Sequence, residues 1–266
     1  MASGRREQNT PLTAAGRQAV LLFLFACGLY GEYREAEGDH FTQAMAESHC
    51  RHLEGGKWRL PSIKELFTLR GQSDRFSRER AYWSSNTVHD GKSQGGTGSE
   101  GEVGEGTTIG YTFYLQDGDV TLSPLDKRAG VICTDALLPP PKSVYRLGAA
   151  GIEDSRNNIV WMALEASDKK KKYTYSEAKS FCEELAYEQR EWRLPSVDEL
   201  YSIVDYGHLR PAVDTALFGV MMNRYYWSDD EFGEEKAYVV GFKFGSVATS
   251  SKENRSYVRC VSDTQE

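Results

Sequence analysis

Cysteine is the residue type in this chain whose spacing points most directly to chemistry. Four of the five cysteines are predicted to form two pairs, Cys50 with Cys133 and Cys182 with Cys260, because they fall at equivalent places in a repeat. A disulfide within each pair would close a loop of about eighty residues and stabilise the fold by several kcal/mol in the chain-entropy model. No CxxC or HxxxH spacing typical of zinc accompanies the thiols. Disulfides would imply an oxidising compartment; the alternative is four buried free thiols in a cytosolic protein.

Histidine does not complete a catalytic or metal site in the sequence. The chain has no H-E-x-x-H motif and no G-x-x-x-x-G-K-[ST] phosphate-binding motif. None of the five histidines pairs with a nucleophile or stands at a metal-ligand spacing: His40, His49, His52, His89 and His208. We therefore predict that the protein is not an enzyme.

An internal repeat organises the elements that must position these side chains. The nine residues Trp58–Leu66 recur almost unchanged as Trp192–Leu200. Flanking segments repeat in the same order: Phe41–Cys50 with Tyr175–Cys182, Tyr82–Ser84 with Tyr226–Ser228, and Gly130–Cys133 with Tyr257–Cys260. The cysteines stand at equivalent places in the two copies, and this predicts the pairing of Cys50 with Cys133 and of Cys182 with Cys260.

Each copy is expected to be α+β. In the second copy, apolar spacing predicts a helix over 176–184 with Ser176 as its N-cap. A second helix is predicted to start at Pro195 or Ser196, followed by short strands over 237–242, 245–249 and 256–261. The fold class is therefore two tandem domains, each with two helices and a small, mostly antiparallel sheet.

The repeated motif is interpreted as scaffold. Its tryptophans and leucines are expected to fill the core, its prolines to set a turn, and its arginines to pair with a carboxylate of the same motif. The scaffold residues are Trp58, Arg59, Pro61 and Glu65 in the first copy and Trp192, Arg193, Pro195 and Glu199 in the second.

The N-terminus resembles a secretory signal, with arginines before a short apolar run over 19–27. We predict a signal peptide or lipoprotein signal over 1–28, with Cys27 either removed or lipidated; a first buried strand over 22–30 is the alternative. The first domain is assigned to 29–136, with a glycine-rich insertion over 91–110. A proline-rich linker over 137–147 precedes the second domain over 148–266.

The net charge excludes one class of partner. The chain carries 39 acidic and 32 basic residues, a formal net charge of -7. Nonspecific nucleic-acid binding draws its affinity from neutralising phosphates with basic side chains, so we expect no nucleic-acid partner.

The helix with cysteine, the WRLPSxxEL motif, the Tyr-Trp-Ser element and the closing Tyr-Val-Arg-Cys-Val segment together resemble the Lcl C-terminal domain family. This family comprises bacterial extracytoplasmic domains, mostly of unknown function, with a C-type-lectin-like fold. The second copy matches throughout, including an opening strand over 158–161, whereas the first is degenerate, with Ile132 in place of Arg259. The resemblance implies two C-type-lectin-like domains in an exported bacterial protein of the periplasm, outer membrane or cell surface.

Three groups of residues are candidates for ligand binding. Lys169, Lys170, Lys171 and Lys172 concentrate positive charge that would suit a sulfated glycan or an acidic lipid headgroup. Tyr226 and Trp227 are aromatic residues that would stack on a sugar, although a place in the core is favoured because both copies keep them in a strand-like context. Asp229 and its acidic neighbours offer oxygen ligands for calcium, but the motifs of calcium-dependent lectins are absent, so we predict no cofactor and no metal.

These observations predict an exported, non-catalytic binding module, adhesin-like or associated with the cell envelope. Its expected partner is a glycan or a surface protein, and its contact with a membrane is expected only through a lipid on Cys27. The alternatives are a structural subunit of an envelope assembly and an enzyme of the sulfatase-modifying type, which would need a redox-active cysteine pair.

Overall fold

The computed structural model describes residues 31–70, 75–77, 79–89, 108–116, 118–136, 145–163, 170–219 and 221–264. The predictions for the N-terminal signal, Cys27 and the alternative strand over 22–30 lie outside these residues. So do Lys169, most of the predicted glycine-rich insertion and most of the predicted linker. None of the helices in the described ranges combines the length and apolar character needed to cross a membrane.

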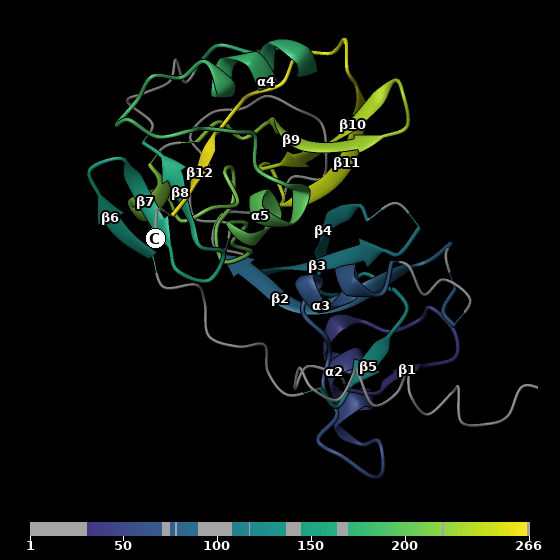
Figure 1. The fold of residues 1–266 in the computed structure, drawn as a ribbon. Helices are drawn as coiled ribbons and strands as arrows, with labels where there is room; N and C mark the ends of the chain where they lie inside the picture. Colours follow the sequence, from purple (N-terminus) through teal and green to yellow (C-terminus); the bar gives the residue numbers. More distant parts are fainter. Residues whose placement is uncertain are drawn as a thin grey trace, which may run out of the picture.

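The described residues of the first half form two helices and two small antiparallel sheets (Figure 1). Strands β2, β3 and β4 form one sheet in that order, and β1 pairs with β5 in the other. The bounds are β1 (Tyr33–Glu35), α2 (Gln43–Arg51), α3 (Ile63–Thr68), β2 (Ala81–His89), β3 (Thr108–Tyr114), β4 (Val120–Pro124) and β5 (Ile132–Thr134).

The second half repeats this order of elements and adds to it. Its two sheets are antiparallel, with the strand orders β11-β10-β9 and β12-β8-β7-β6. The bounds are β6 (Tyr145–Gly148), β7 (Gly151–Asp154), β8 (Ile159–Met162), α4 (Tyr175–Glu183), α5 (Val197–Ser202), α6 (Thr215–Phe218), β9 (Tyr225–Phe232), β10 (Lys236–Gly241), β11 (Ser246–Ser251) and β12 (Val261–Asp263). Small antiparallel sheets with few helices give the mixed α and β architecture that the sequence predicts.

Capping side chains set where the helices begin. Ser62 and Ser196 cap α3 and α5, and in each case the glutamate three residues later accepts a hydrogen bond from the serine backbone. The predicted start of α4 at Ser176 is wrong, because Thr174 caps this helix in a capping box with Glu177. A threonine with a glutamate at the third helical position satisfies two backbone donors at once, which Ser176 does not do.

The predicted alignment of Phe41 with Tyr175 is also wrong, because it does not match the residues at which the two helices begin. Thr42 caps α2 as Thr174 caps α4, so Phe41 corresponds to Tyr173. The tryptophan indoles agree: Trp83 Nε1 donates to the carbonyl of Phe41, and Trp227 Nε1 donates to that of Tyr173, each at 2.8 Å.

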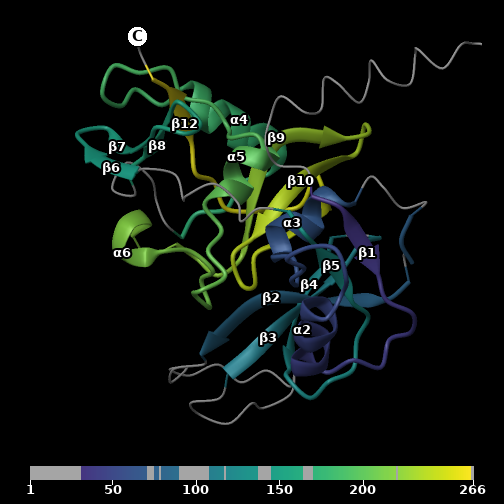
Figure 2. The same cartoon turned by 90° about the horizontal axis from the view of Figure 1, so that it is seen from below.

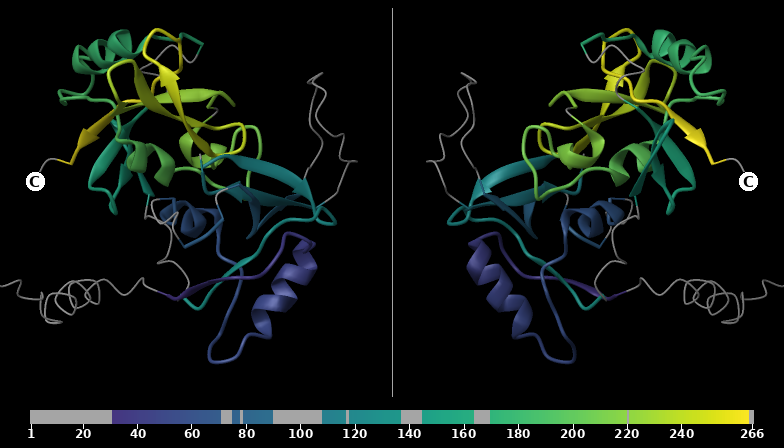
Figure 3. Two further views of the ribbon diagram at one scale, coloured as in Figure 1. Left: turned by 90° about the vertical axis from the view of Figure 1, so that its right-hand side faces the viewer. Right: turned by 90° about the vertical axis from the view of Figure 1, so that its left-hand side faces the viewer.

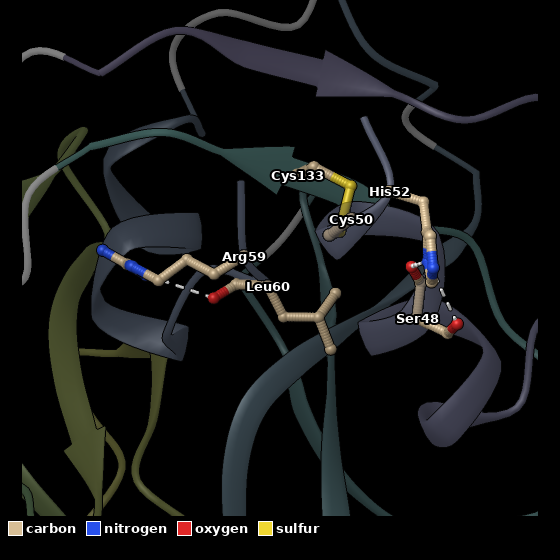
Figure 4. Close-up of a disulfide and its surroundings, with 6 residues drawn as sticks. All are labelled: Ser48, Cys50, His52, Arg59, Leu60 and Cys133. Atoms are coloured by element: carbon tan, nitrogen blue, oxygen red, sulfur yellow. Dashed lines mark hydrogen bonds between the residues drawn. A yellow bond between two sulfur atoms is a disulfide. The ribbon is translucent and has the colours of Figure 1, made fainter. Parts of the chain in front are cut away.

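Both predicted disulfides are present. Cys50 in α2 bonds to Cys133 in β5, as Figure 4 shows, and Cys182 in α4 bonds to Cys260 just before β12. The sequence separations are 83 and 78 residues, for which the chain-entropy model gives a stabilisation of about 4.5 kcal/mol each. Each disulfide therefore ties the first helix of its half to the closing strand.

The buried side chains fall into three clusters. One cluster lies within the first half around Trp58, Trp83 and the Cys50–Cys133 disulfide, and another within the second half around Trp192 and Trp227. The largest cluster draws on both halves and joins α3 and the β2-β3-β4 sheet to α5 and the β9-β10-β11 sheet. Figures 1 and 3 show α2 and α4 at opposite ends of the molecule, away from this shared core.

Several predicted boundaries differ from the structure. The insertion assigned to 91–110 ends earlier, because Thr108–Gly110 belong to β3, where Ile109 is buried. The linker assigned to 137–147 also ends earlier, since residues 145–147 pair with β7 as part of β6. The strand expected over 256–261 is reduced to isolated bridges at Ser256 and Tyr257, and regular pairing starts at Val261. The second half has a third helix, α6, capped by Asp214.

Candidate functional site

The predicted aromatic ligands Tyr226 and Trp227 are core residues. Their exposed fractions are 4% and 0%, so neither ring faces solvent. Trp227 packs edge-on against Tyr175, whereas Tyr226 packs against Phe242 on the opposite face of β9. Burial raises the pKa of the Tyr226 hydroxyl to about 12. The prediction that these two rings bind a ligand is wrong, because β9 is covered on both of its faces.

The acidic run at the end of β9 is divided among separate contacts. Asp229 forms an ion pair with Lys179 at 2.7 Å, and Glu231 forms one with Lys252 at 3.0 Å. Asp230 instead accepts a hydrogen bond from the backbone of Val197 at the start of α5. In the described part of the chain, no three His, Cys, Asp or Glu side chains are placed to hold a metal ion. Asp229 is half-exposed, and its partner in this structure is the Lys179 ammonium group.

The lysine run is exposed and lies against tyrosine rings. Lys170, Lys171 and Lys172 all face solvent. The Lys171 ammonium lies 4.9 Å from the centre of the Tyr173 ring, and that of Lys172 lies 5.4 Å from the Tyr257 ring. Cations over aromatic faces are attracted by the ring quadrupole, which favours this placement of the lysine side chains.

A fourth cation joins the lysines through a backbone bridge. Tyr173 and Ser256 exchange two backbone hydrogen bonds of 2.9 and 3.0 Å, which places Arg255 beside the lysine run. The Arg255 guanidinium donates to the carbonyl of Lys172 at 3.1 Å and to the Glu177 carboxylate at 2.9 Å. We call Lys170, Lys171, Lys172 and Arg255 the cationic strip.

The carboxylate of Glu177 borders the cationic strip. Hydrogen bonds from the Thr174 backbone and from Arg255 hold the pKa of Glu177 below its ordinary value, so this group is a carboxylate at neutral pH. Four cations with one carboxylate leave the strip with a net positive charge. An anion is therefore the kind of ligand that this surface attracts.

The first half has the same backbone arrangement with different side chains. Phe41 and Ala129 form the equivalent bridge, and Arg128 donates to the carbonyl of His40 as Arg255 does to that of Lys172. Asp39 and His40 therefore occupy the places of Lys171 and Lys172, and Gly38, whose φ is 84°, stands at the sequence position of Lys170. Only the arginine is shared, so the positive charge is concentrated in the second half.

Comparison with known proteins relates the second half to a family. Residues 150–262 match the family model described as the Lcl C-terminal domain. This segment, which is less than half of the chain, is similar to that family. A comparison with curated proteins found no match. Among solved structures, the chain is similar to botrocetin, with 13% identity and a TM-score of 0.30, over 40% of this chain and 89% of that one.

The second copy of the repeated motif is buried at Trp192 and Leu194 and partly exposed at Arg193. Arg193 makes a two-pronged ion pair with Glu199, with distances of 2.8 and 2.9 Å, and also contacts Asp263. Burial alone would raise the pKa of Glu199, but hydrogen bonds from Arg193 and Ser196 hold it below its ordinary value. The two prongs fix the guanidinium plane between α5 and β12.

The equivalent pair in the first half has the same geometry. The Arg59 guanidinium meets Glu65 at 2.9 and 2.6 Å, and it also donates to the carbonyl of Ala136. Trp58 and Trp192 are buried, as are Leu60 and Leu194. These residues position backbone and core, which agrees with their interpretation as scaffold.

Sequence reasoning missed Arg255 as a member of the cationic strip. It is separated from Lys172 by 83 residues, and only the bridge between Tyr173 and Ser256 brings the two together. The available signal was the equivalent arginine in the first half, Arg128, which precedes the closing strand in the same way.

Proposed function

We propose that this protein is an exported, non-catalytic binding module that recognises a sulfated glycan through the cationic strip of its Lcl C-terminal domain. The strip carries the proposal, because it gathers four exposed cations on a surface whose backbone is fixed by a bridge and a nearby disulfide. Sulfate groups are anions that stay charged at every physiological pH, so such cations would attract them without a metal ion.

The disulfides support the proposed export. Each half has one disulfide between its first helix and its closing strand, and such bonds persist in oxidising compartments. The same bonds support a non-catalytic role, since all four described cysteines are disulfide-bonded and a sulfatase-modifying type of enzyme needs a redox-active pair. A lipid on Cys27 would then attach the protein to the envelope.

We also propose that the two halves are copies of one domain. The equivalent helix caps, disulfides, indole hydrogen bonds and Arg-Glu pairs support this proposal. In this view the first half keeps the scaffold of the Lcl C-terminal domain but has lost the lysines of the strip.

The direct test is titration of the full chain with a heparin-type sulfated oligosaccharide, followed by calorimetry at two salt concentrations. Replacing Lys170, Lys171 and Lys172 with alanine should weaken binding about tenfold, since an exposed ion pair contributes about 0.5 kcal/mol. Raising the salt concentration from 0.05 to 0.5 M should also weaken binding of the oligosaccharide by the unmodified protein, because exposed charges are screened over about 10 Å at 0.1 M.

Two matched controls distinguish binding by the cationic strip from an effect of the net charge of the protein. Alanine at Lys57, Lys127 and Lys236 removes the same number of exposed charges elsewhere and should leave binding within about twofold of the unmodified protein. Arg255→Ala should weaken binding, whereas Arg128→Ala, its equivalent in the first half, should not. Equal losses from both lysine triples, or no binding of the sulfated probe by the unmodified protein, would refute the proposal and favour a structural subunit that binds proteins.

A further inference from the structure

The contact between the two halves involves equivalent residues. Extending the repeated motif by one residue beyond Leu66 and Leu200 aligns Phe67 with Tyr201. The rings of these two residues stack on each other, with centroids 4.5 Å apart and an angle of 29° between their planes. Contact between a residue and its own equivalent is what an approximate twofold axis between two copies would produce, as in an isologous dimer.

Contacts around this aromatic pair hold α3 and α5 together. The Lys64 ammonium donates to the carbonyl of Ser202 at 2.9 Å and lies 5.8 Å from the centre of the Tyr201 ring. Phe67 also packs edge-on against Phe113 of β3, so the pair is continuous with the shared core. Figure 2 shows α3 close to α5 and β10 from a second direction.

The second half adds a tyrosine that has no equivalent in the first. Tyr206 belongs to the segment 205–214, which is present only in the second copy. Its ring packs edge-on against Tyr111 of β3, with centroids 5.3 Å apart. Its hydroxyl lies 2.9 Å from that of Tyr201 and donates to the carbonyl of Gly245 at 2.7 Å. Tyr206 is buried, so the additional segment forms part of the contact between the halves.

We infer that the aromatic face of the second half, formed by Tyr201 and Tyr206, is a domain-pairing surface whose partner is the first half of the same chain. The two halves pack across an approximate twofold axis as an internal dimer. The first half, which lacks the lysines of the strip, then has a defined role: it covers an aromatic surface that would otherwise face water. This role is independent of what the cationic strip binds.

Internal pairing makes a prediction about cooperativity that can be measured on the full chain. Leu60 lies in the cluster confined to the first half, and its equivalent Leu194 lies in the cluster confined to the second. Leu60→Val should lower the hydrogen-exchange protection of amides in β10 and β11 by the same factor as in β2 and β3. Leu194→Val, in the second half, should likewise lower the protection of amides in β2 and β3 by the same factor as in β10 and β11. The reason in both cases is that one shared core links the two halves.

The aromatic pair supplies a second measurement. Phe67→Leu and Tyr201→Leu should each lower the urea midpoint, and the double variant should lower it by less than the sum of the two, since each single change already removes the stacking contact. Tryptophan fluorescence and far-UV circular dichroism should report the same midpoint in every variant.

The result that overturns the inference is separate behaviour of the halves. It would appear as loss of protection restricted to the half that carries the leucine change, together with additive effects of Phe67→Leu and Tyr201→Leu. Valine and leucine replacements retain most of the buried apolar volume, so the comparison does not depend on variants that fail to fold.

Discussion

Two buried tyrosines at the contact between the halves should respond with opposite sign to loss of their hydroxyl group. The Tyr206 hydroxyl donates to the carbonyl of Gly245 and lies within hydrogen-bond distance of the Tyr201 hydroxyl. The Tyr111 hydroxyl is fully buried and has no hydrogen-bond partner among the described residues. Desolvation raises the pKa of both groups above the ordinary range, so each hydroxyl stays protonated at physiological pH.

The expected magnitudes follow from these contacts. Tyr206→Phe removes a donor from the Gly245 carbonyl and an acceptor from Tyr201, and leaving buried partners unsatisfied costs about 1–3 kcal/mol. Tyr111→Phe breaks no hydrogen bond to a described residue. It removes a hydroxyl whose burial without a partner destabilises the folded state. We therefore expect Tyr111→Phe to change the free energy of unfolding by between zero and about 1 kcal/mol in the stabilising direction.

The assay is equilibrium urea unfolding of the two variants beside the unmodified protein, followed by tryptophan fluorescence. Both changes keep the aromatic ring, so the packing of Tyr111 against Tyr206 is retained and serves as an internal control. A destabilisation by Tyr111→Phe as large as that by Tyr206→Phe would refute the reasoning, since it would show that the Tyr111 hydroxyl makes a bond as valuable as those of Tyr206.

Two further predictions concern the cysteines and the response to acid. Intact mass of protein purified from its native host should show a mature chain starting at Cys27 or Leu29, with four cysteines that alkylate only after reduction; an unprocessed chain with free thiols would exclude export. Glu199 has a pKa below its ordinary value, so the stability that it contributes is present above the unfolded pKa near 4.3 and is lost as the pH falls through the folded pKa. Glu199→Gln should therefore lower stability at pH 7 and reduce its dependence on pH below about 4.5, which urea titrations between pH 3 and pH 7 would measure; an unchanged pH dependence would contradict this account.

Local signals predicted the parts of the fold that depend on neighbouring residues. The caps Ser62 and Ser196 and the pairs of Arg59 with Glu65 and Arg193 with Glu199 follow from side chains a few positions apart. The disulfides were predictable for a different reason, because the repeat placed the four cysteines in equivalent positions and left one consistent pairing.

Features that depend on distant packing were not predictable in the same way. The assignment of Tyr226 and Trp227 as ligand residues was wrong because the sequence does not show that β9 is covered on both faces. Arg255 was missed because a bridge between distant segments places it beside Lys172. The stacking of Phe67 on Tyr201 likewise depends on how the halves pack, which no local pattern records.

Differences between the two halves indicate where the proposed recognition of an anion would reside. The elements that both halves keep are the capped helices, the buried tryptophans and the partly buried Arg-Glu pairs, and they fix the backbone. The bridge of each half therefore presents side chains at the same place, namely Asp39 and His40 in the first half and Lys171 and Lys172 in the second. Since backbone geometry is shared and the charge is not, binding of an anion should follow the side chains. A first half given lysines at positions 39 and 40 should gain affinity for the sulfated probe, whereas Gly38 is left unchanged because its φ of 84° disfavours a side chain.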